Sequence, residues 1–394
     1  MNDFLSPSRV VLAMSGGVDS SVAASLLCRQ GFEVIGVFMR HGEESPVACG
    51  PGLLPILPAG ERLDHKQGCC SAADADDARR VADRLGIPFY ALNLRAEFGR
   101  IIDYFVDEYS RGRTPNPCVM CNNWLKFGKL FDYADSVGAR YVATGHYARL
   151  ASPLGRCEIG ARHRDGDQGK HNDVALYRGL DAQKDQSYVL FGVEPDRLQR
   201  MLLPIGGYRK SEIRELAREF GLRVAHKPDS QEICFVTGGK HAEFVAERRR
   251  GGETRGEIIT TEGNVVGQHD GIEAFTIGQR KGLGVAMGEP YFVVRIDPQS
   301  RRVVIGKKEA LACWRLTADR LNWLADLPRT PFQCLAQIRY NSPAQSATAH
   351  LDPEGCLQVR FDQACYGVAP GQAVVLYDED RVLGGGWIRA ADAG

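Results

Sequence analysis

The stretch that decides the fold is Val10–Ser21, "VVLAMSGGVDSS". Its first part is a short apolar run with β-branched residues, which predicts a buried strand. Helical spacing starts at Val18 and continues to Gln30, and Gly31 predicts the end of that helix. A strand that turns through two glycines into a helix is the first unit expected of a doubly wound α/β sheet.

The same alternation continues along the chain. We expect the long, Gly- and Pro-rich range 41–67 to be a flexible loop and Arg162–Asp173 to be a solvated hairpin tip. The pattern predicts a parallel sheet. We expect strands at Phe32–Met39, Pro88–Leu94 and Tyr141–Thr144, and helices at Ser71–Leu85, Glu97–Arg111, Lys126–Val137 and Lys210–Phe220.

Beyond about Val224 the pattern changes to short β-type runs separated by Gly, Asp and Pro, which predicts small antiparallel sheets or barrels. The predicted fold class is α/β, with a doubly wound parallel-sheet domain followed by two small β-rich domains. We place these domains at 1–225, 226–290 and 291–394, the last of them a β-barrel.

Composition limits the function classes. With 394 residues, 44% of them hydrophobic and 25% charged, the chain is long enough for several folded domains. Its 49 basic and 49 acidic residues cancel, so any nucleic-acid partner must bind local patches. No signal peptide and no apolar run near the roughly 20 residues of a membrane helix are evident. Twelve scattered cysteines indicate reduced thiols and a cytoplasmic location.

The glycine turn Ser15–Ser21, "SGGVDSS", predicts a phosphate site. Gly16 and Gly17 let backbone N–H groups face an anion, and the helix N-terminus adds partial positive charge. An ordinary capped turn would use similar residues, but the double glycine and clustered hydroxyls favour phosphate binding. The loop is not a Walker motif, because no Gly-Lys in the chain is followed by Ser or Thr.

Thr114–Asn122, "TPNPCVMCN", places a Cys-x-x-Cys pair on what we interpret as a proline-stiffened loop. One such pair is a poor zinc site, which needs four ligands. Positioned, accessible thiols are reactive, so we expect chemistry here and at Cys234 in Asp229–Phe235, "DSQEICF". We interpret the cysteines without a motif as small core residues: Cys28, Cys157, Cys313, Cys334, Cys356 and Cys365.

Several motifs together carry a resemblance. "SGGVDSS" resembles the PP-loop of ATP pyrophosphatases, which cleave ATP to AMP and pyrophosphate. In order along the chain, "SGGVDSS", "GRTPNPCVMCN", "ATGHYAR", "KDQSY", "DSQEICF" and "FTIGQRKGLG" look like the tRNA-specific 2-thiouridylase family. That family installs sulfur at C2 of the wobble uridine of certain tRNAs.

The resemblance implies roles residue by residue. Cys121 matches the family's nucleophile and Cys234 the cysteine that receives a persulfide. The implied ATP site comprises Ala13, Met14, Ser15, Gly16, Gly17, Val18, Asp19, Ser20, Met39 and Gly145, with Mg²⁺ near Asp19. The implied tRNA contacts are Asn116, Pro117, Cys118, His146, Lys184, Asp185, Gln186, Arg339, Tyr340 and Gln372.

The resemblance also implies a persulfide donor, such as a cysteine desulfurase or a relay protein, and a monomer or weak dimer. Many relatives have Asp where this chain has Cys118, so no general base is assigned. A second hypothesis places an iron–sulfur cluster on Cys118, Cys121 and Cys234. Two other functions compete: a different PP-loop ligase or sulfurtransferase, and an RNA-binding module without catalysis.

Overall fold

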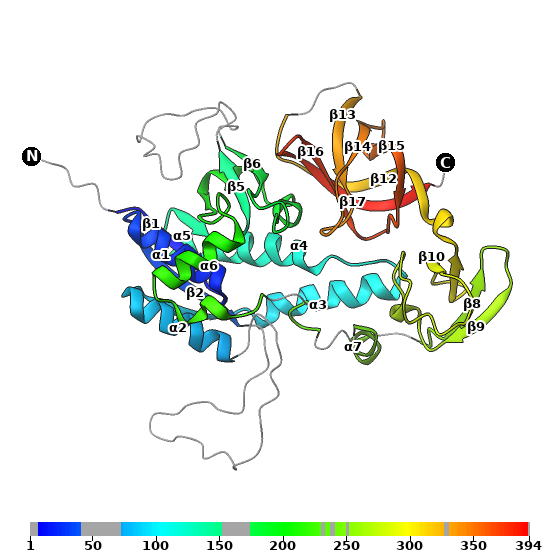
Figure 1. Ribbon diagram of the computed structural model, residues 1–394, viewed down its shortest axis with the longest axis horizontal. Coiled ribbons are helices and arrows are strands. Elements are labelled where there is room, and N and C mark those ends of the chain that lie inside the picture. Colours follow the sequence, from blue (N-terminus) through cyan, green and yellow to red (C-terminus); the bar gives the residue numbers. More distant parts are fainter. Residues whose placement is uncertain are drawn as a thin grey trace, which may run out of the picture.

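The computed structural model describes residues 7–40, 72–151, 174–229, 233–236, 241–249, 252–326 and 331–392 (Figure 1). The expected loop at 41–67, the expected hairpin tip at 162–173 and Cys157 lie outside the described residues. Three sheets organise the described chain.

The first sheet is parallel and runs in the order β3-β2-β1-β4-β7. The strands predicted from the sequence are all present, within one or two residues. Their bounds are β1 Arg9–Ala13, β2 Glu33–Arg40, β3 Phe89–Asn93, β4 Tyr141–Ala143 and β7 Met201–Leu202.

Helices cover both faces of this sheet, so the doubly wound prediction is confirmed. Alternate side chains of β1 enter two separate cores, Val10 and Leu12 on one face and Val11 on the other. The first face packs against α1 (Val18–Arg29), α2 (Ala72–Leu85) and α6 (Lys210–Glu219). The second face packs against α3 (Arg95–Ser110) and α5 (Leu130–Ser136).

The Cys-x-x-Cys pair lies on a helix, so the predicted loop is wrong. Helix α4, Pro117–Cys121, continues through η1, Asn122–Lys129, directly into α5. The Asn116 side chain caps α4 by accepting a 3.3 Å hydrogen bond from the Val119 N–H. Pro117 stands at the start of the helix, where its missing N–H costs nothing. Asn-Pro is therefore a helix start here.

The second sheet has the order β10-β11-β8-β9. The predicted boundary at 290/291 separates strands that belong to this one sheet, because β11 pairs in parallel with β8. Sequence spacing could not reveal this long-range pairing. The bounds are β8 Gly256–Thr260, β9 Val265–His269, β10 Phe292–Asp297 and β11 Arg302–Gly306.

The third sheet has the order β12-β15-β14-β13-β16-β17-β6-β5, and an added pairing of β12 with β17 closes most of it into a barrel. The hairpin β5–β6 comes from the first part of the chain and extends the barrel beside β17 (Figure 1). The bounds are β5 Ala148–Ala151, β6 Ala175–Arg178, β12 Ala312–Trp323, β13 Phe332–Gln337, β14 Gln345–Leu351, β15 Leu357–Tyr366, β16 Ala373–Asp378 and β17 Arg381–Asp392.

Tyr188 joins the barrel to the parallel-sheet region. Its ring is fully buried in a core that also contains Tyr377 and Trp387 of the barrel. Its hydroxyl donates to the Ala373 carbonyl at 3.0 Å.

The remaining helical segments are η2 Ser187–Leu190, η3 Pro195–Arg200, η4 Arg223–His226, α7 His241–Arg248, η5 Ile272–Ala274 and η6 Lys308–Leu311. Among the described residues, no helix is long and apolar enough to cross a membrane.

Candidate active site

The predicted nucleotide residues lie at the carboxyl ends of the strands in the parallel sheet. Ala13 ends β1, Met39 lies near the end of β2, and Gly145 follows β4. Because β2 and β4 flank β1 on opposite sides, the chain changes direction across the sheet at this point. Such switch points, at the carboxyl ends of parallel strands, are where α/β sheets bind ligands.

Backbone crowding explains the glycines of the loop. Gly16 has φ +72°, and a Cβ there would lie 2.1 Å from the Asp74 carbonyl oxygen of α2. A Cβ on Gly145 would lie 2.8 Å from the Ser20 backbone nitrogen. Gly17 is the residue that begins α1 in an extended conformation. Three segments of backbone therefore meet where the N–H groups of α1 can face an anion.

The hydroxyls of the loop differ in availability. Ser15 is exposed, and its N–H donates to Ser20 Oγ at 3.2 Å. Ser21 is fully buried, and its Oγ donates to the Gly17 carbonyl at 2.8 Å. Of the clustered hydroxyls, that of Ser21 is therefore already used inside the helix.

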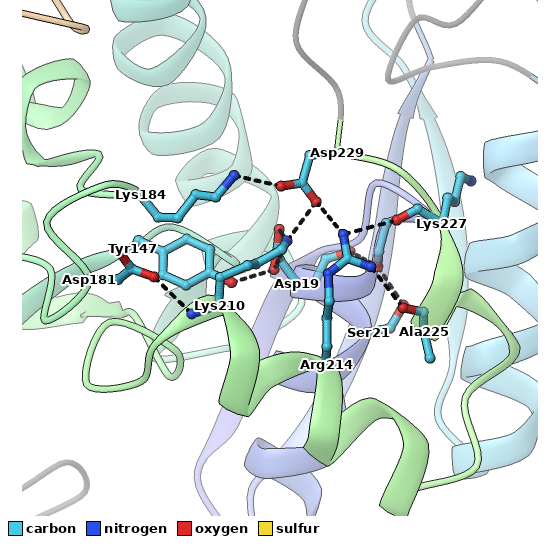
Figure 2. Close-up of polar contacts among 12 residues, drawn as sticks. Asp19, Ser21, Tyr147, Asp181, Lys184, Lys210, Arg214, Ala225, Lys227 and Asp229 are labelled. Atoms are coloured by element: carbon cyan, nitrogen blue, oxygen red, sulfur yellow. Dashed lines mark hydrogen bonds and ion pairs between the residues drawn. The ribbon is translucent and has the colours of Figure 1, made fainter.

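Charged side chains surround the loop (Figure 2). Asp19 accepts a 2.6 Å hydrogen bond from the Tyr147 hydroxyl and lies 2.8 Å from the Lys210 ammonium. Burial and the charge of Asp19 raise the pKa of the Tyr147 hydroxyl, which keeps it protonated as a donor. Lys227 donates to the Gly16 carbonyl at 3.0 Å.

Lys227 also fixes α2 against the loop. Its Nζ lies 2.6 Å from Asp74 and 2.7 Å from Asp77. Burial opposes its charge, but the two carboxylates outweigh that effect and raise its pKa. Sequence reasoning missed Tyr147, Lys227 and Asp229 as parts of the site. Two of them, Tyr147 and Asp229, stood inside quoted motifs, "ATGHYAR" and "DSQEICF".

The candidate cysteines lie on two segments that pack near α3. Cys118 is exposed on the first turn of α4, and Cys121, at its end, is half-buried. Cys234 is half-buried, and its neighbour Phe235 makes edge-on ring contacts with Phe105 of α3, at 5.2 Å between centroids.

Helix α4 contacts the same helix α3 (Figure 1). Both Cys121 and Cys234 pack against the core that contains Phe98 of α3. The fold therefore brings these two distant stretches of sequence onto one helix.

Two of the predicted tRNA contacts, Tyr340 and Gln372, lie near Cys118 or the start of α4. The pKa of the Tyr340 phenol is raised by burial and by the nearby charges of Asp185 and Cys118. Gln372 Nε2 donates to the Pro115 carbonyl at 2.8 Å, beside the start of α4. Asp185 itself is held by Arg178 at 2.9 Å. Residues from the barrel and from the parallel-sheet region therefore meet at the exposed turn of α4.

Other predicted contacts are already engaged with protein groups in the described structure. His146 is 5% exposed; its ring lies 2.7 Å from Thr144 Oγ1 and 3.4 Å from Lys126 Nζ. Burial, followed by the Lys126 charge, holds its pKa well below the usual value. Arg339 donates to the Ile277 and Gly367 carbonyls, each at 2.7 Å. Lys184 pairs with Asp229 at 2.8 Å.

Three family models match successive parts of the chain. They are described as a tRNA methyl transferase HUP domain, over 8–238, a tRNA methyl transferase PRC-barrel domain, over 242–307, and an aminomethyltransferase beta-barrel domain, over 314–388.

Curated relatives match nearly the whole chain. A tRNA-specific 2-thiouridylase MnmA of Rhodopirellula baltica is 56% identical, covering 98% of this chain and 97% of the relative. The chain belongs to the tRNA-specific 2-thiouridylase family. The relatives of the same name from Carboxydothermus hydrogenoformans and Geobacter metallireducens are each 45% identical and cover 98% and 97% of this chain.

The described residues give no support for the hypothesis of an iron–sulfur cluster on Cys118, Cys121 and Cys234. Cys118, Cys121 and Cys234 are all described, yet no three Cys, His, Asp or Glu side chains converge as metal ligands within the described part of the chain. A cluster held by three thiolates needs such convergence.

Proposed function

We propose that the protein is an ATP-dependent tRNA sulfurtransferase that converts the wobble uridine of tRNA to 2-thiouridine. The observation that carries this proposal is near-complete coverage by 2-thiouridylases at up to 56% identity, with the glycine loop and both predicted working cysteines in place. ATP use follows from the PP-loop family.

The glycine loop binds the phosphates of ATP in this proposal. The N–H groups at the start of α1 and the positive end of the helix attract the anion. Ala13–Ser20, Met39 and Gly145 line the nucleotide site at the sheet edge. Mg²⁺ would be bound near Asp19, which contacts Lys210 and Tyr147 in the described structure.

Activation comes before sulfur transfer. The C2 oxygen of uridine is a poor leaving group, so it attacks the α-phosphate of ATP, and pyrophosphate leaves. AMP on C2 is then the leaving group. The target base must leave its stack to reach a buried nucleotide, as in other base-modifying enzymes.

Sulfur transfer uses the two cysteines. A donor of the cysteine desulfurase or relay class delivers a persulfide to Cys234. Its terminal sulfur attacks C2, and AMP departs with the C2 oxygen. The Cys121 thiolate then attacks the Cys234 sulfur, which releases the terminal sulfur on the base as 2-thiouridine and leaves a Cys121–Cys234 disulfide. A thiol reductant restores both thiols.

The tRNA surface in this proposal is the exposed turn of α4 and its neighbours, including Asn116, Pro117 and Cys118. Tyr340 and Gln372, from the barrel, support or contact the anticodon region together with Asp185 and Gln186, which precede η2. His146, Lys184 and Arg339 would reach the RNA only after leaving the contacts that they make in the described structure. We further propose a cytoplasmic monomer or weak dimer.

A different PP-loop ligase is the second candidate function, because the glycine loop alone does not select a substrate. Exchange of labelled pyrophosphate into ATP separates the candidates. We expect exchange that depends on tRNA; an amidating enzyme would exchange without tRNA, and an RNA-binding module would not exchange at all.

Thiolation of a tRNA with a wobble uridine tests the proposal directly. The reaction contains ATP, Mg²⁺ and a persulfide donor, and retarded migration on a mercury-containing gel detects the product. We expect thiolation by the wild type and by Cys118→Ala, because Cys118 is neither the nucleophile nor the persulfide carrier. Absence of product with both proteins, in air and without oxygen, would contradict the function.

A further inference from the structure

Three cationic side chains contact the Asp229 carboxylate beside the nucleotide loop (Figure 2). Lys184 and Lys210 each lie 2.8 Å from it, and Arg214 lies 3.2 Å from it. Burial alone would raise the pKa of Asp229, but hydrogen bonds from the two lysines outweigh that effect and lower it. Its carboxylate is therefore charged and held from three sides.

Lys210 is shared between Asp229 and the nucleotide loop. Its Nζ lies 2.8 Å from both carboxylate oxygens of Asp19 as well as 2.8 Å from Asp229. Lys210 is only 9% exposed, and its backbone N–H donates to Asp181 at 3.0 Å as α6 begins. A buried ammonium between two carboxylates is strongly held, and its removal leaves two like charges side by side.

Asp229 stands a few residues before Cys234 in the chain. Phe235, on the other side of Cys234, packs against Phe98 and Phe105 of α3. The cysteine is thus placed between an ionic anchor at the nucleotide loop and an aromatic anchor on α3.

We propose that Lys210 is a positioning residue that couples the nucleotide loop to Cys234 through Asp229. This inference rests on the proposed function. Triphosphate brings negative charge to the start of α1, where Lys210 is within reach of both the anion and Asp19. A phosphate that attracts the Lys210 ammonium weakens the ion pair between Lys210 and Asp229. Nucleotide binding therefore gives Cys234 more freedom to move. By linkage, the Lys210–Asp229 ion pair opposes nucleotide binding by the same coupling free energy.

Alkylation of Cys234 measures this coupling. The intact protein is treated with iodoacetamide for short times, and the Cys234 peptide is quantified by mass spectrometry. Each variant is measured alone and with saturating ATP analogue that has a methylene between the α- and β-phosphates. Saturation is set for each variant by calorimetric titration, so weaker binding does not imitate lost coupling.

In the wild type, we expect the analogue to accelerate Cys234 alkylation by about fivefold, the lower end of typical couplings between sites. Asp229→Asn removes the anchor but leaves Lys210 on Asp19, so alkylation should already be fast and insensitive to the analogue. Lys210→Met should behave similarly, and Lys210→Arg should restore part of the response because it keeps the charge.

Lys129→Met is the matched control, since Lys129 forms an exposed 3.1 Å pair with Asp132 on the opposite face of the sheet. It should respond to the analogue as the wild type does.

An unchanged fivefold response in Asp229→Asn would overturn the inference, and so would a wild type that does not respond. If Lys210→Met does not fold, Asp229→Asn alone decides. Loss of thiolation by the wild type, with coupling intact, would contradict the proposed function and not this inference.

Discussion

Two regions of the molecule contain several cysteines each, and the cysteines differ in their exposure to solvent. At α4 and the segment 233–236, Cys118 is exposed while Cys121 and Cys234 are half-buried. In the barrel, Cys313 on β12 is the register partner of Cys365 on β15, and the two residues are 4% and 3% exposed.

The chemistry of the two pairs should differ accordingly. Burial, followed by the charge of Cys313, raises the pKa of Cys365 to about 12, and burial also raises the pKa of Cys313. The thiolate is the reactive form, so the barrel thiols should be unreactive even though they are paired in register. Closeness of two sulfurs does not make a working pair; access and a position beside the substrates do.

The largest expected effect is on thiolation. Cys121→Ser and Cys234→Ser should each lower the rate by about 10³-fold or more, as for loss of a nucleophile. Nucleotide binding should survive in both, because neither residue lies in the loop 15–21. The barrel control Cys365→Ala should keep the wild-type rate. A Cys365→Ala enzyme as inactive as Cys121→Ser would remove the contrast between the two regions.

The next largest expected effect is on the rate of cysteine alkylation, which should be faster at α4 than in the barrel. A pKa raised from 9.0 to about 12 lowers the thiolate fraction of Cys365 at neutral pH by on the order of 10³. Peptide mass spectrometry after brief iodoacetamide treatment should find Cys118 modified and Cys365 intact at pH 7.5. Rapid modification of Cys365 in the folded protein at this pH would mean that the barrel opens easily.

The glycines before and after α1 allow a position in the nucleotide loop to be compared with a position that only ends the helix. Gly16 and Gly31 both have positive φ, so alanine costs roughly 1 kcal/mol of stability at either. Only at Gly16 would the new Cβ meet backbone, since Gly31 has nothing within 4 Å. Gly16→Ala should therefore weaken nucleotide binding by tenfold or more, and Gly31→Ala should not. Calorimetric titration measures both; equal losses would place the loop away from the nucleotide.

The smallest effect concerns stability. Cys365→Ala should lower the free energy of unfolding by about 1 kcal/mol at pH 7, since it removes a buried side chain. A pKa raised by folding stabilises the native state below pH 9.0, and this contribution is lost as the pH rises toward about 12. The difference between wild type and Cys365→Ala in urea unfolding should therefore shrink above pH 9. A difference that grows with pH would contradict the burial effect.

Local patterns in the sequence predicted much of this architecture. The apolar strand before Gly16 and the helix after it were predictable because strand, turn and helix are adjacent in the chain. The buried state of Cys313, Cys334 and Cys365 was also correct, while Cys28 and Cys356 are half-buried.

Long-range pairing was not predictable in the same way. Nothing in the runs around Phe292 or Arg302 indicates that β10 and β11 join β8, or that the hairpin β5–β6 extends the barrel. The helical start at Pro117 was misread as a loop, although the capping Asn116 was a usable signal. The Asp229 network needed Lys184 and two cations of α6, Lys210 and Arg214, on separate segments that only the fold brings together.

A single turnover tests the central claim most directly. Enzyme loaded with persulfide on Cys234 is mixed with tRNA and ATP without reductant, and 2-thiouridine, AMP and disulfide-linked peptides are quantified together. We expect one 2-thiouridine and one AMP for each Cys121–Cys234 disulfide, with Cys313 and Cys365 still as thiols. Thiolated tRNA without that disulfide would contradict the assignment of these two cysteines as the working pair.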